Sequence, residues 1–290
     1  MVPPFVSVVI PHRGNDGDLK KCLSALGHQT YGQEDFEVIV VLSGPPSQAI
    51  KALSAANIQL ISRHKNSVYA ARNEGIRIAR GSIIALTDSD AVPDRHWIER
   101  AIELVGDEKV IVAGSIALTF SSFPLSPAAC YEKLFSFDQK KNVQAGRSVT
   151  ANMIVAKSVF SDYGYFRGDS ATGEDFRWSQ QVVSFGVPIV FSERARVTHP
   201  ARETMAALIK KSWRDSYLWE TKLEPRHRIL NGFFFWQKRY LSLPSWSRIN
   251  GCSRRELLLA LLTLQVVQLV KVVGFLSGMA TPRSNCAREL

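Results

Sequence analysis

Cysteine is scarce in this chain of 290 residues, and the four cysteines that occur are widely spaced. Cys22, Cys130, Cys252 and Cys286 form no Cys-X-X-Cys pair and no cluster with histidine. Structural zinc sites and disulfide-framed secreted domains both need closely spaced ligands or conserved-looking cysteine patterns. We therefore expect neither, and a reducing cytoplasm is the simplest compartment.

The beginning of the sequence also lacks the features of a secretory signal. Residues 1–4 carry no basic segment, and the apolar run from Phe5 to Ile10 is shorter than the apolar centre of a signal peptide. No repeat of fixed period and no degenerate block occurs. Because 46% of residues are hydrophobic and 21% are charged, we expect most of the chain to fold.

Acidic residues are the minority among the charged ones, with 26 Asp and Glu against 36 Lys and Arg. The resulting formal charge of +10 favours polyanions as partners. Nucleic acid, an anionic membrane and a diphosphate substrate all satisfy that preference equally well. The charge alone therefore does not decide among these partner classes.

Short runs rich in β-branched residues alternate with helical patterns through the first hundred residues. Strands are expected at Val6–Ile10, Glu37–Leu42, Ile58–Ser62 and Ile83–Thr87, and helices at Leu19–Leu26, Ala49–Ala56 and Val68–Ala79. This alternation predicts an α/β fold with a Rossmann-like, doubly wound and mostly parallel sheet. Ligands bind at the carboxyl ends of such strands, so the residues just after each strand are the candidates for chemistry.

The pattern is less regular between residues 113 and 152, where we predict no elements but expect the acceptor side of a site. After it, a strand is expected at Met153–Ala156, helices at Ser158–Tyr163 and after Gly173, and a strand at Pro188–Phe191. We expect one α/β domain over residues 1–200 and a helical extension over residues 201–290.

Two carboxylates, Asp88 and Asp90, directly follow the fourth expected strand. Separated by one residue at the end of an apolar strand, they can hold a divalent cation that bridges a diphosphate. In the alternative interpretation they only end the strand, and Asp94 caps the next helix. The position after a parallel strand favours the cation.

A second acidic pair, Glu174 and Asp175, stands at an expected helix start. Thr172 and these two acids are also typical of a helix N-terminus, where a capping side chain and negative charge are both favourable. Structural capping therefore remains an alternative to a catalytic role.

Six short motifs together resemble the family 2 glycosyltransferases, which have the GT-A fold. They occur in the family's order over about residues 5–200, and each alone is weak evidence. The motifs are Val6-Ser7-Val8-Val9-Ile10-Pro11, Gln29-Thr30-Tyr31, Ala71-Arg72-Asn73-Glu74-Gly75, Thr87-Asp88-Ser89-Asp90, Gly173-Glu174-Asp175 and Val197-Thr198-His199.

The resemblance implies an inverting glycosyltransferase that moves a sugar from a nucleotide-diphosphate donor to an acceptor hydroxyl. It implies that Asp88, Asp90 and His199 bind a metal ion, Mn²⁺ or Mg²⁺, with Asp88 also on the substrate, and that Asp175 is the general base beside Glu174. A mixed carboxylate and imidazole set suits Mn²⁺ somewhat better. A lone histidine is also often structural, which stays open for His199.

The same resemblance places Pro11, His12, Arg13 and Arg72 around the nucleotide. Ser43 stands where the family usually has an aspartate that contacts the base and ribose, so the resemblance does not identify the donor base. A second departure concerns the acceptor side. Arg177, followed by Trp178, stands where another aspartate is common, and the acceptor pocket formed by these two residues is expected to be unusual.

The implied pathway is cell-envelope polysaccharide or glycolipid synthesis with a saccharide or lipid-linked acceptor. A nucleotide-sugar-binding protein without transferase activity is the alternative, because the aspartate at Ser43 is missing. We expect no nucleic-acid partner, since only charge and interleaved aromatics favour one.

The last third of the sequence changes to a basic and aromatic composition between Arg202 and Trp246. Such a surface suits a membrane interface, and an aromatic helical layer over the sheet is equally compatible. Leu257–Ala280 is apolar except for a stripe of Gln265, Gln268 and Lys271. The stripe favours a helix in the membrane interface, with a membrane span or a buried helix as alternatives. We expect a cytoplasmic protein at the inner face of the membrane.

Overall fold

The computed structural model describes residues 4–51, 57–63, 67–106, 109–170, 172–220, 244 and 246–280. The chain divides into two compact units, residues 1–117 with 137–200, and residues 118–136 with 201–290. Residues 118–136, which the predicted domain boundaries assign to the first domain, lie in the second unit. The prediction of two domains divided at residue 200 stays a prediction.

The first unit is built on a sheet with the strand order β3-β2-β1-β4-β7-β6-β8-β5 among the described residues. Its strands are β1 (Val6–His12), β2 (Phe36–Ser43), β3 (Ile58–Arg63), β4 (Ile83–Thr87), β5 (Val92–Pro93), β6 (Ile111–Thr119), β7 (Asn152–Ala156) and β8 (Ile189–Pro200). The strands expected from the sequence are all present, with ends shifted by a few residues at most, except that β8 runs nine residues further, to Pro200.

The sheet is parallel in one half and mixed in the other. β1 pairs in parallel with β2 and β4, and β2 pairs in parallel with β3, as the alternation of strands and helices predicts. β7 runs antiparallel to both β4 and β6. This antiparallel half includes β6 from the region where the sequence indicated no element. The α/β class is confirmed, and the result is a curled mixed sheet.

Helices cover both faces of this sheet. They are α1 (Asp16–Gly27), α2 (Gln48–Lys51), α3 (Val68–Ile78), α4 (Trp97–Val105), α6 (Gln139–Gln144), α7 (Lys157–Tyr163) and α8 (Glu174–Ser184). The expected helix at Ala49–Ala56 extends into residues outside the described part. α6 was not predicted, because its six residues contain a single apolar side chain, Val143, and hence no helical periodicity.

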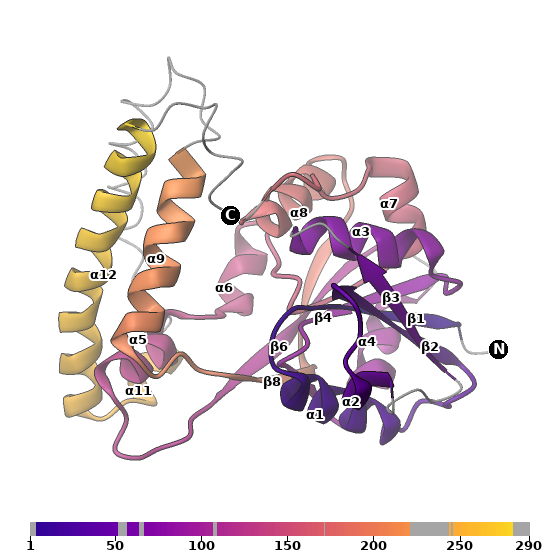
Figure 1. Ribbon diagram of the computed structural model, residues 1–290, viewed down its shortest axis with the longest axis horizontal. Helices are drawn as coiled ribbons and strands as arrows, with labels where there is room; N and C mark the ends of the chain where they lie inside the picture. The colour runs from indigo at the N-terminus through magenta and orange to yellow at the C-terminus, as the bar shows by residue number, and fades with distance from the viewer. Residues whose placement is uncertain are drawn as a thin grey trace. The chain divides into compact units, whose positions relative to one another are not determined.

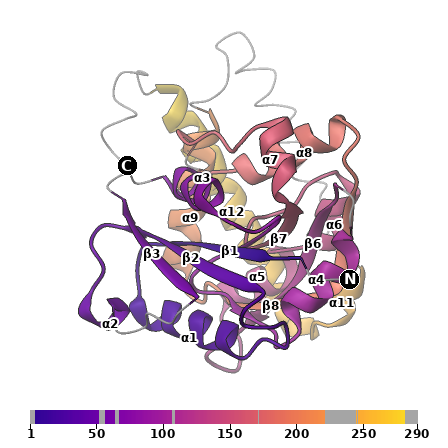
Figure 2. The same cartoon turned by 90° about the vertical axis from the view of Figure 1, so that its right-hand side faces the viewer.

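Side chains of β1 alternate between the two faces, as a strand requires. Val8 and Ile10 pack into a core with α1 and α4, and Val9 packs into a second core with α3, α7 and α8. α1 and α2 lie on one side of the sheet and α3, α7 and α8 on the other (Figures 1 and 2). The carboxyl ends of the parallel strands stay uncovered between these layers, where ligand sites form in such sheets.

Gly75 lets α3 lie close to the sheet. A Cβ added at this position would come within 2.5 Å of Cγ1 of Val9. A larger residue would push the helix away from β1 and β2. The glycine of the Ala71–Gly75 motif therefore positions the first turns of α3, which carry Tyr69 and Arg72.

The second unit contains α5 (Pro127–Phe135), α9 (Met205–Glu220), α11 (Trp246–Asn250) and α12 (Arg254–Ala280). α12 lies along α9, and Gly274 allows the close approach, since a Cβ there would be 2.7 Å from the carbonyl oxygen of Trp213 (Figure 1). α5 was not predicted from the sequence. Ala128 and Tyr131 of α5 contact Leu208 of α9 and Val267 of α12 in one cluster.

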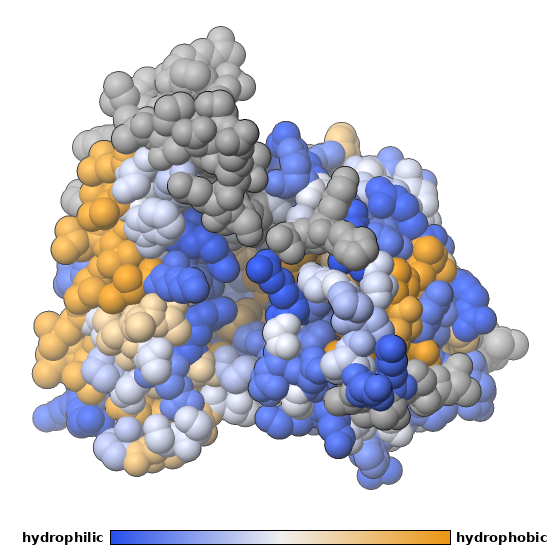
Figure 3. Space-filling view, in the orientation of Figure 1, coloured by the Kyte–Doolittle hydropathy of each residue, from blue (hydrophilic) through white to orange (hydrophobic). Residues whose placement is uncertain are grey.

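The three residues of the expected polar stripe on α12 differ in exposure, because Gln265 is exposed, Lys271 is half-buried and Gln268 is buried. Gln268 is only 5% exposed, and the buried Thr263 donates a hydrogen bond to the carbonyl oxygen of Pro127. Apart from Gln265, the exposed positions between Leu258 and Leu276 are apolar and form a face along the helix (Figure 3). This apolar face consists of Leu258, Leu261, Leu262, Val266, Leu269, Val273 and Leu276.

The stretch Arg254–Gly278 is long and apolar enough to cross a membrane, and 28% of its most apolar 18 residues is buried. One such helix is weak evidence for a span, because core helices of soluble proteins can pass the same test. Much of the basic aromatic segment lies outside the described residues. This applies to Lys222, Arg226, Arg228, Phe233–Trp236, Lys238, Arg239 and Tyr240.

Asn152, the first residue of β7, joins three other elements through its side chain. Its Oδ1 accepts from Nε1 of Trp97 at 2.8 Å, and its Nδ2 donates to the carbonyl oxygens of Ser115 and Ala195. The residue is fully buried, so no water replaces these bonds. A single amide thus connects β7 with α4, β6 and β8.

Asn152→Ala should therefore lower the free energy of unfolding by about 3 kcal/mol or more, because it leaves a buried indole N–H and two carbonyl oxygens unpaired. Chemical denaturation of the variant and the parent measures the difference. Asn57→Ala is the matched control, since among the described residues its side-chain amide bonds the exposed Gln33 side chain alone. A loss below about 1 kcal/mol for Asn152→Ala would contradict the role of this amide.

Candidate functional site

A tight turn follows β4 and presents two carboxylates. The amide of Ala91 donates to the carbonyl oxygen of Asp88 at 3.1 Å, which closes the turn. The chain then forms β5, in which Val92 pairs with Thr198 of β8. This pairing brings His199, the next residue of β8, beside the turn.

Ligand atoms of Asp88, Asp90 and His199 lie within 4.8 Å of one another. Nε2 of His199 is 3.3 Å from Oδ1 of Asp90 and 4.0 Å from Oδ2 of Asp88. Nδ1 of the same ring lies 2.9 Å from the carbonyl oxygen of Pro200. A carbonyl only accepts, so Nδ1 carries a proton, which directs Nε2 toward the carboxylates as in histidine ligands of metal sites.

The electrostatics of His199 are those of a cation site. Burial lowers its pKa, but the hydrogen bond to Asp90 and the charges of Asp90 and Asp88 outweigh burial, and the net pKa is raised. A positive charge is therefore favoured between the imidazole and the carboxylates, either as a proton or as a metal ion. Two carboxylates and one imidazole fit a divalent cation.

Arg72, from the second turn of α3, reaches the same cluster. Its Nη2 atom forms an ion pair with Oδ1 of Asp88 at 2.5 Å, and the Arg72 side chain is only 4% exposed. Its Nε has no hydrogen-bond partner among the residues that the structure describes. A buried guanidinium with an unused donor beside a cation site suits an anionic ligand such as a phosphate.

The ends of β1 and β2 lie side by side, with His12 opposite Leu42 in the register. This brings together Pro11 and His12, which are buried, and Arg13 and Ser43, which are exposed. Nε2 of His12 lies 3.2 Å from Oδ1 of Asp16, and Nδ1 has no partner in the described part of the chain. The expected nucleotide-side residues thus share one edge of the sheet.

Asp16 joins this edge although the sequence analysis did not select it. Its Oδ2 accepts a hydrogen bond from Oγ of Ser47 at 2.6 Å. The hydrogen bonds from Ser47 and His12 lower the pKa of Asp16. Ser47 is 31 residues away from Asp16 along the chain, so no local sequence pattern was available to indicate this contact.

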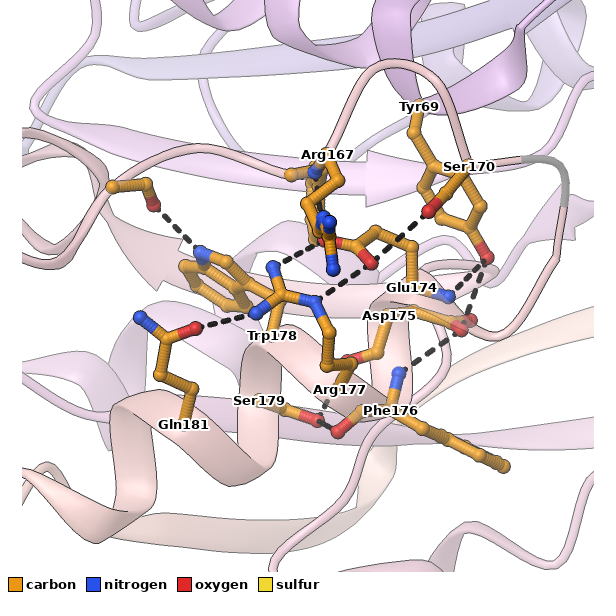
Figure 4. Close-up of polar contacts among 12 residues, drawn as sticks. Tyr69, Arg167, Ser170, Glu174, Asp175, Phe176, Arg177, Trp178, Ser179 and Gln181 are labelled. Carbon is orange, nitrogen blue, oxygen red and sulfur yellow. Dashed lines mark hydrogen bonds and ion pairs between the residues drawn. The ribbon is translucent and has the colours of Figure 1, made fainter. Parts of the chain in front are cut away.

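Asp175 lies at the start of α8 with one oxygen held more firmly than the other (Figure 4). Oδ1 accepts from the Tyr69 hydroxyl at 3.1 Å and from the amide of Phe176 at 3.0 Å. Oδ2 has a longer contact of 3.4 Å with the amide of Thr150. Burial raises the pKa of Asp175, while the charge of Arg72 and these hydrogen bonds act in the opposite direction.

Glu174 has a different environment from its neighbour. It is 2% exposed, and its oxygens accept from the amide of Arg167 at 2.6 Å, from Ser170 Oγ at 3.3 Å and from Arg177 Nε at 2.8 Å. Nη2 of Arg177 donates a second hydrogen bond, to Oε1 of Glu174. The Glu174 carboxylate is therefore occupied by contacts that hold the loop before α8 (Figure 4).

The structure contradicts one expectation about this segment, which is that Trp178 contacts a substrate. Trp178 is 1% exposed, stacks on Phe160 with ring centroids 4.6 Å apart and donates to the carbonyl oxygen of Gly164. It is a core residue, because its large apolar ring is buried by aromatic neighbours, and it offers no surface to a substrate. Arg177 is bound to Glu174 and Gln181 and stays 38% exposed, so its expected place on the acceptor side remains a prediction.

The structure contradicts side-chain capping by these acids, whereas Glu174 and Asp175 do lie in the first turn of α8, where negative charge is favourable. α8 begins after Gly173, which has φ of 69° and makes no side-chain capping bond. α4 begins after His96, and Oδ1 of Asp94 accepts from the amide of His96 before the helix. Neither acidic pair therefore supplies an N-cap.

Comparison with known proteins gives a consistent result. The model of the family described as "Glycosyl transferase family 2" matches residues 7–163. Glycosyltransferase AglE of Haloferax volcanii is 31% identical over 220 residues, which cover 73% of this chain and 71% of that protein. A Methanococcus voltae protein is 22% identical over 232 residues, 72% of this chain and 70% of its own length. Its name is dolichyl N-acetyl-alpha-D-glucosaminyl phosphate 3-beta-D-2,3-diacetamido-2,3-dideoxy-beta-D-glucuronosyltransferase.

A solved structure shares the fold. It is the mannosyltransferase PcManGT from Pyrobaculum calidifontis, in complex with GDP-Man and Mn²⁺. The TM-score is 0.63 at 16% sequence identity, and the match covers 94% of this chain and 87% of that one. The likeness shows that the sheet described above has the GT-A arrangement.

Mn²⁺ binding tests the cluster directly. Asp90→Asn and His199→Gln should each weaken Mn²⁺ binding by more than about tenfold, measured by the electron paramagnetic resonance of free Mn²⁺. Asp94→Asn is the control, because that carboxylate lies near the cluster but outside it. A proton on Nε2 of His199 competes with the metal ion, and the pKa of His199 is raised. The Mn²⁺ affinity of the parent should therefore begin to fall at a higher pH than it would with a histidine of ordinary pKa. If both variants bind Mn²⁺ with the affinity of the parent, the assignment of the metal site to this cluster is wrong.

Proposed function

The chain belongs to glycosyltransferase family 2 and is therefore an enzyme of glycosyl transfer, and we propose that it moves a sugar from a nucleotide-diphosphate donor to an acceptor hydroxyl with inversion. One observation carries this proposal. A continuous set of contacts, Asp175–Tyr69–Arg72–Asp88, links a carboxylate suited to proton transfer with the candidate cation site.

On the donor side, Asp88, Asp90 and His199 would hold Mn²⁺ or Mg²⁺. When bound, the ion offsets the negative charge that develops on the departing diphosphate. The complex of PcManGT with GDP-Man and Mn²⁺ supports this choice of donor class and metal. Arg72, with its unused Nε, contributes a fixed positive charge next to the same phosphates.

The nucleotide would lie along the edge formed by Pro11, His12, Arg13 and Ser43. His12 is held by Asp16, so its unpaired Nδ1 has a fixed direction. Ser43 and Arg13 are exposed and complete the edge. A serine offers one short hydroxyl where a carboxylate would accept two hydrogen bonds, so we propose that Asp16 supplies the acidic group on this side.

On the acceptor side, Asp175 would act as general base. A hydroxyl is a poor nucleophile near neutral pH, and a carboxylate with a raised pKa accepts its proton more readily than an ordinary one. Proton removal during attack on the face opposite the leaving group gives a single displacement with inversion. Glu174 remains a positioning residue, because its oxygens already bind Arg177, Ser170 and Arg167.

Asp175→Asn should lower single-turnover rates by about 10²–10⁴-fold with little change in donor affinity, because only proton transfer is removed. Rapid-quench kinetics gives the rate, and calorimetric titration with a nucleotide sugar and Mn²⁺ gives the affinity. Glu174→Gln should cost less in rate and more in thermal stability, since it weakens the Arg177 pair. Near-parental turnover of Asp175→Asn would place the base elsewhere, and parental donor binding without any turnover in the unsubstituted protein would favour a binding protein.

The acceptor we propose is a saccharide or a lipid-linked sugar in cell-envelope polysaccharide or glycolipid synthesis. The Methanococcus voltae relative carries a dolichyl phosphate sugar in its name, which supports a lipid-linked acceptor. Such acceptors are confined to a membrane, so an enzyme that uses them gains from binding at its surface.

The apolar face of α12 would provide that binding at the cytoplasmic leaflet. From Leu258 to Leu276 it extends about 27 Å at 1.5 Å per residue. The opposite side of α12 packs on α9, so only one face is available to lipid, as in a helix that lies in the interface. Arg254 and Arg255 are exposed at its start and suit anionic headgroups.

Leu262→Gln combined with Leu269→Gln should lower binding to vesicles of phosphatidylcholine and phosphatidylglycerol by at least about tenfold, because two exposed leucines lose their apolar contact. Co-sedimentation measures the bound fraction. Leu104→Gln, an exposed leucine of α4, is the matched control. Equal binding of the double variant and the parent would contradict the membrane surface, as would a parent that ignores vesicles.

A further inference from the structure

The first turns of α3 contact the loop and helix that carry Asp175 at several points. Oγ of Ser67 donates to the carbonyl oxygen of Ser170 at 3.2 Å. The amide group of Asn73 bonds both backbone groups of Phe166, donating at 2.7 Å and accepting at 3.2 Å. These bonds hold the segment before α8 against α3.

Tyr69 is the contact that reaches the candidate base itself. Its side chain is 5% exposed, and its ring lies 5.7 Å from the ring of Phe166, which Asn73 fixes. Its oxygen accepts from the amide of Glu174 at 3.2 Å and donates to Oδ1 of Asp175 at 3.1 Å (Figure 4). The direction of the hydroxyl proton is thus fixed, because the incoming amide bond leaves Asp175 as the acceptor for the outgoing one.

Tyr69 also touches the donor side of the site. The guanidinium carbon of Arg72 lies 5.5 Å from the centroid of the Tyr69 ring, and Arg72 holds Asp88 through its NH2 group. A cation over an aromatic face is attracted by the ring. One side chain therefore contacts both the candidate base and the arginine that binds the cation site.

We propose that Tyr69 is a positioning residue that fixes Oδ1 of Asp175, so that Oδ2 receives the proton of the acceptor hydroxyl. Oδ1 is occupied by the Tyr69 hydroxyl and the amide of Phe176, whereas Oδ2 has only the 3.4 Å contact with the amide of Thr150 among the described residues. The inference rests on the proposed role of Asp175 as base. Nothing in the family motifs given above selects this tyrosine.

The groups around Asp175 define what a loss of Tyr69 would change. Arg72 is the charged group whose field favours the carboxylate, and Glu174, the neighbouring acid, is neutralised by Arg177. Arg147 lies over the ring of Phe176 at 5.1 Å. Burial raises the pKa of Tyr69, and the nearby charge of Asp175 raises it further. The hydroxyl therefore remains a donor throughout the working pH range.

Tyr69→Phe keeps the ring against Phe166 and under Arg72 and removes only the hydroxyl. We expect kcat to fall roughly tenfold, since a hydrogen bond to a charged group is lost, with donor KM unchanged. The bond favours the charged carboxylate, so its loss raises the pKa of Asp175. The acid limb of the kcat profile should therefore move to higher pH.

Tyr165→Phe is the matched control, because Tyr165 lies in the same apolar cluster and stacks on Phe160. It should leave kcat and the pH profile at parental values. Circular dichroism and thermal melting of both variants check that the fold is retained. A Tyr69→Phe variant with the parental rate and pH profile would overturn the proposal, and so would an equal loss in both variants.

A double-mutant cycle separates this inference from the proposed function. Asp175→Asn alone tests the base, as described above. If Tyr69 acts through Asp175, Tyr69→Phe should add little to the loss in the Asp175→Asn background. A further tenfold loss in that background would overturn the positioning role of Tyr69 even where Asp175→Asn confirms the base.

Discussion

The ion pair between Arg72 and Asp88 is the interaction on which the site depends. Arg72 comes from α3, and Asp88 follows β4, so the pair fixes a helix of one sheet face to the edge where the parallel strands end. Arg72 is only 4% exposed, so loss of Asp88 would leave a buried guanidinium without its ion-pair partner, which is unfavourable. Both partners have further tasks, because Asp88 faces His199 and Arg72 lies over Tyr69. The pair therefore couples the cation side of the site to the carboxylate at α8.

That coupling is possible because α3 lies close to the sheet. Gly75 removes the side chain that would meet Val9, and Asn73 bonds the backbone of Phe166 across the face of the helix. Gly75 and Asn73 thus bring α3 close both to the strand ends of the sheet and to the segment before α8. In the motif Ala71–Gly75, Asn73 and Gly75 therefore hold the structure in place, and Arg72 supplies a positive charge to the site.

The sequence predicted the parallel half of the sheet and the residues at its edge, because β-branched runs and period-3.6 helices alternate clearly there. In the antiparallel half, β7 and the start of β8 were predicted as strands, whereas β6 and α5 were not, because the sequence between residues 113 and 152 shows no regular pattern. Trp178 was misjudged because exposure is not visible in a sequence, and an aromatic residue after an acidic pair fits a pocket or a core equally well. Gln268 was misjudged in the same way, since it packs inward.

Tyr69 and Asp16 show a second reason why the sequence did not indicate the whole site. Their partners, Asp175 and Ser47, are 106 and 31 residues away along the chain, so no local pattern indicates the contacts. Acid pairs after strands can be found because the parallel topology gathers strand ends at one edge. Contacts from a helix to a distant loop depend on packing, which only the structure supplies.

The second unit is assembled from two separated stretches of chain, and this imposes an order of events during synthesis. α5 is made early, and its apolar residues Ala129 and Leu134, with Leu125 just before the helix, pack with Ala260 of α12, which is made more than a hundred residues later. Until α12 leaves the ribosome, this part of α5 has no such cover. A nascent chain that ends near residue 200 therefore carries an incomplete second unit, and its release before α12 is made exposes apolar surface that association with other chains can bury.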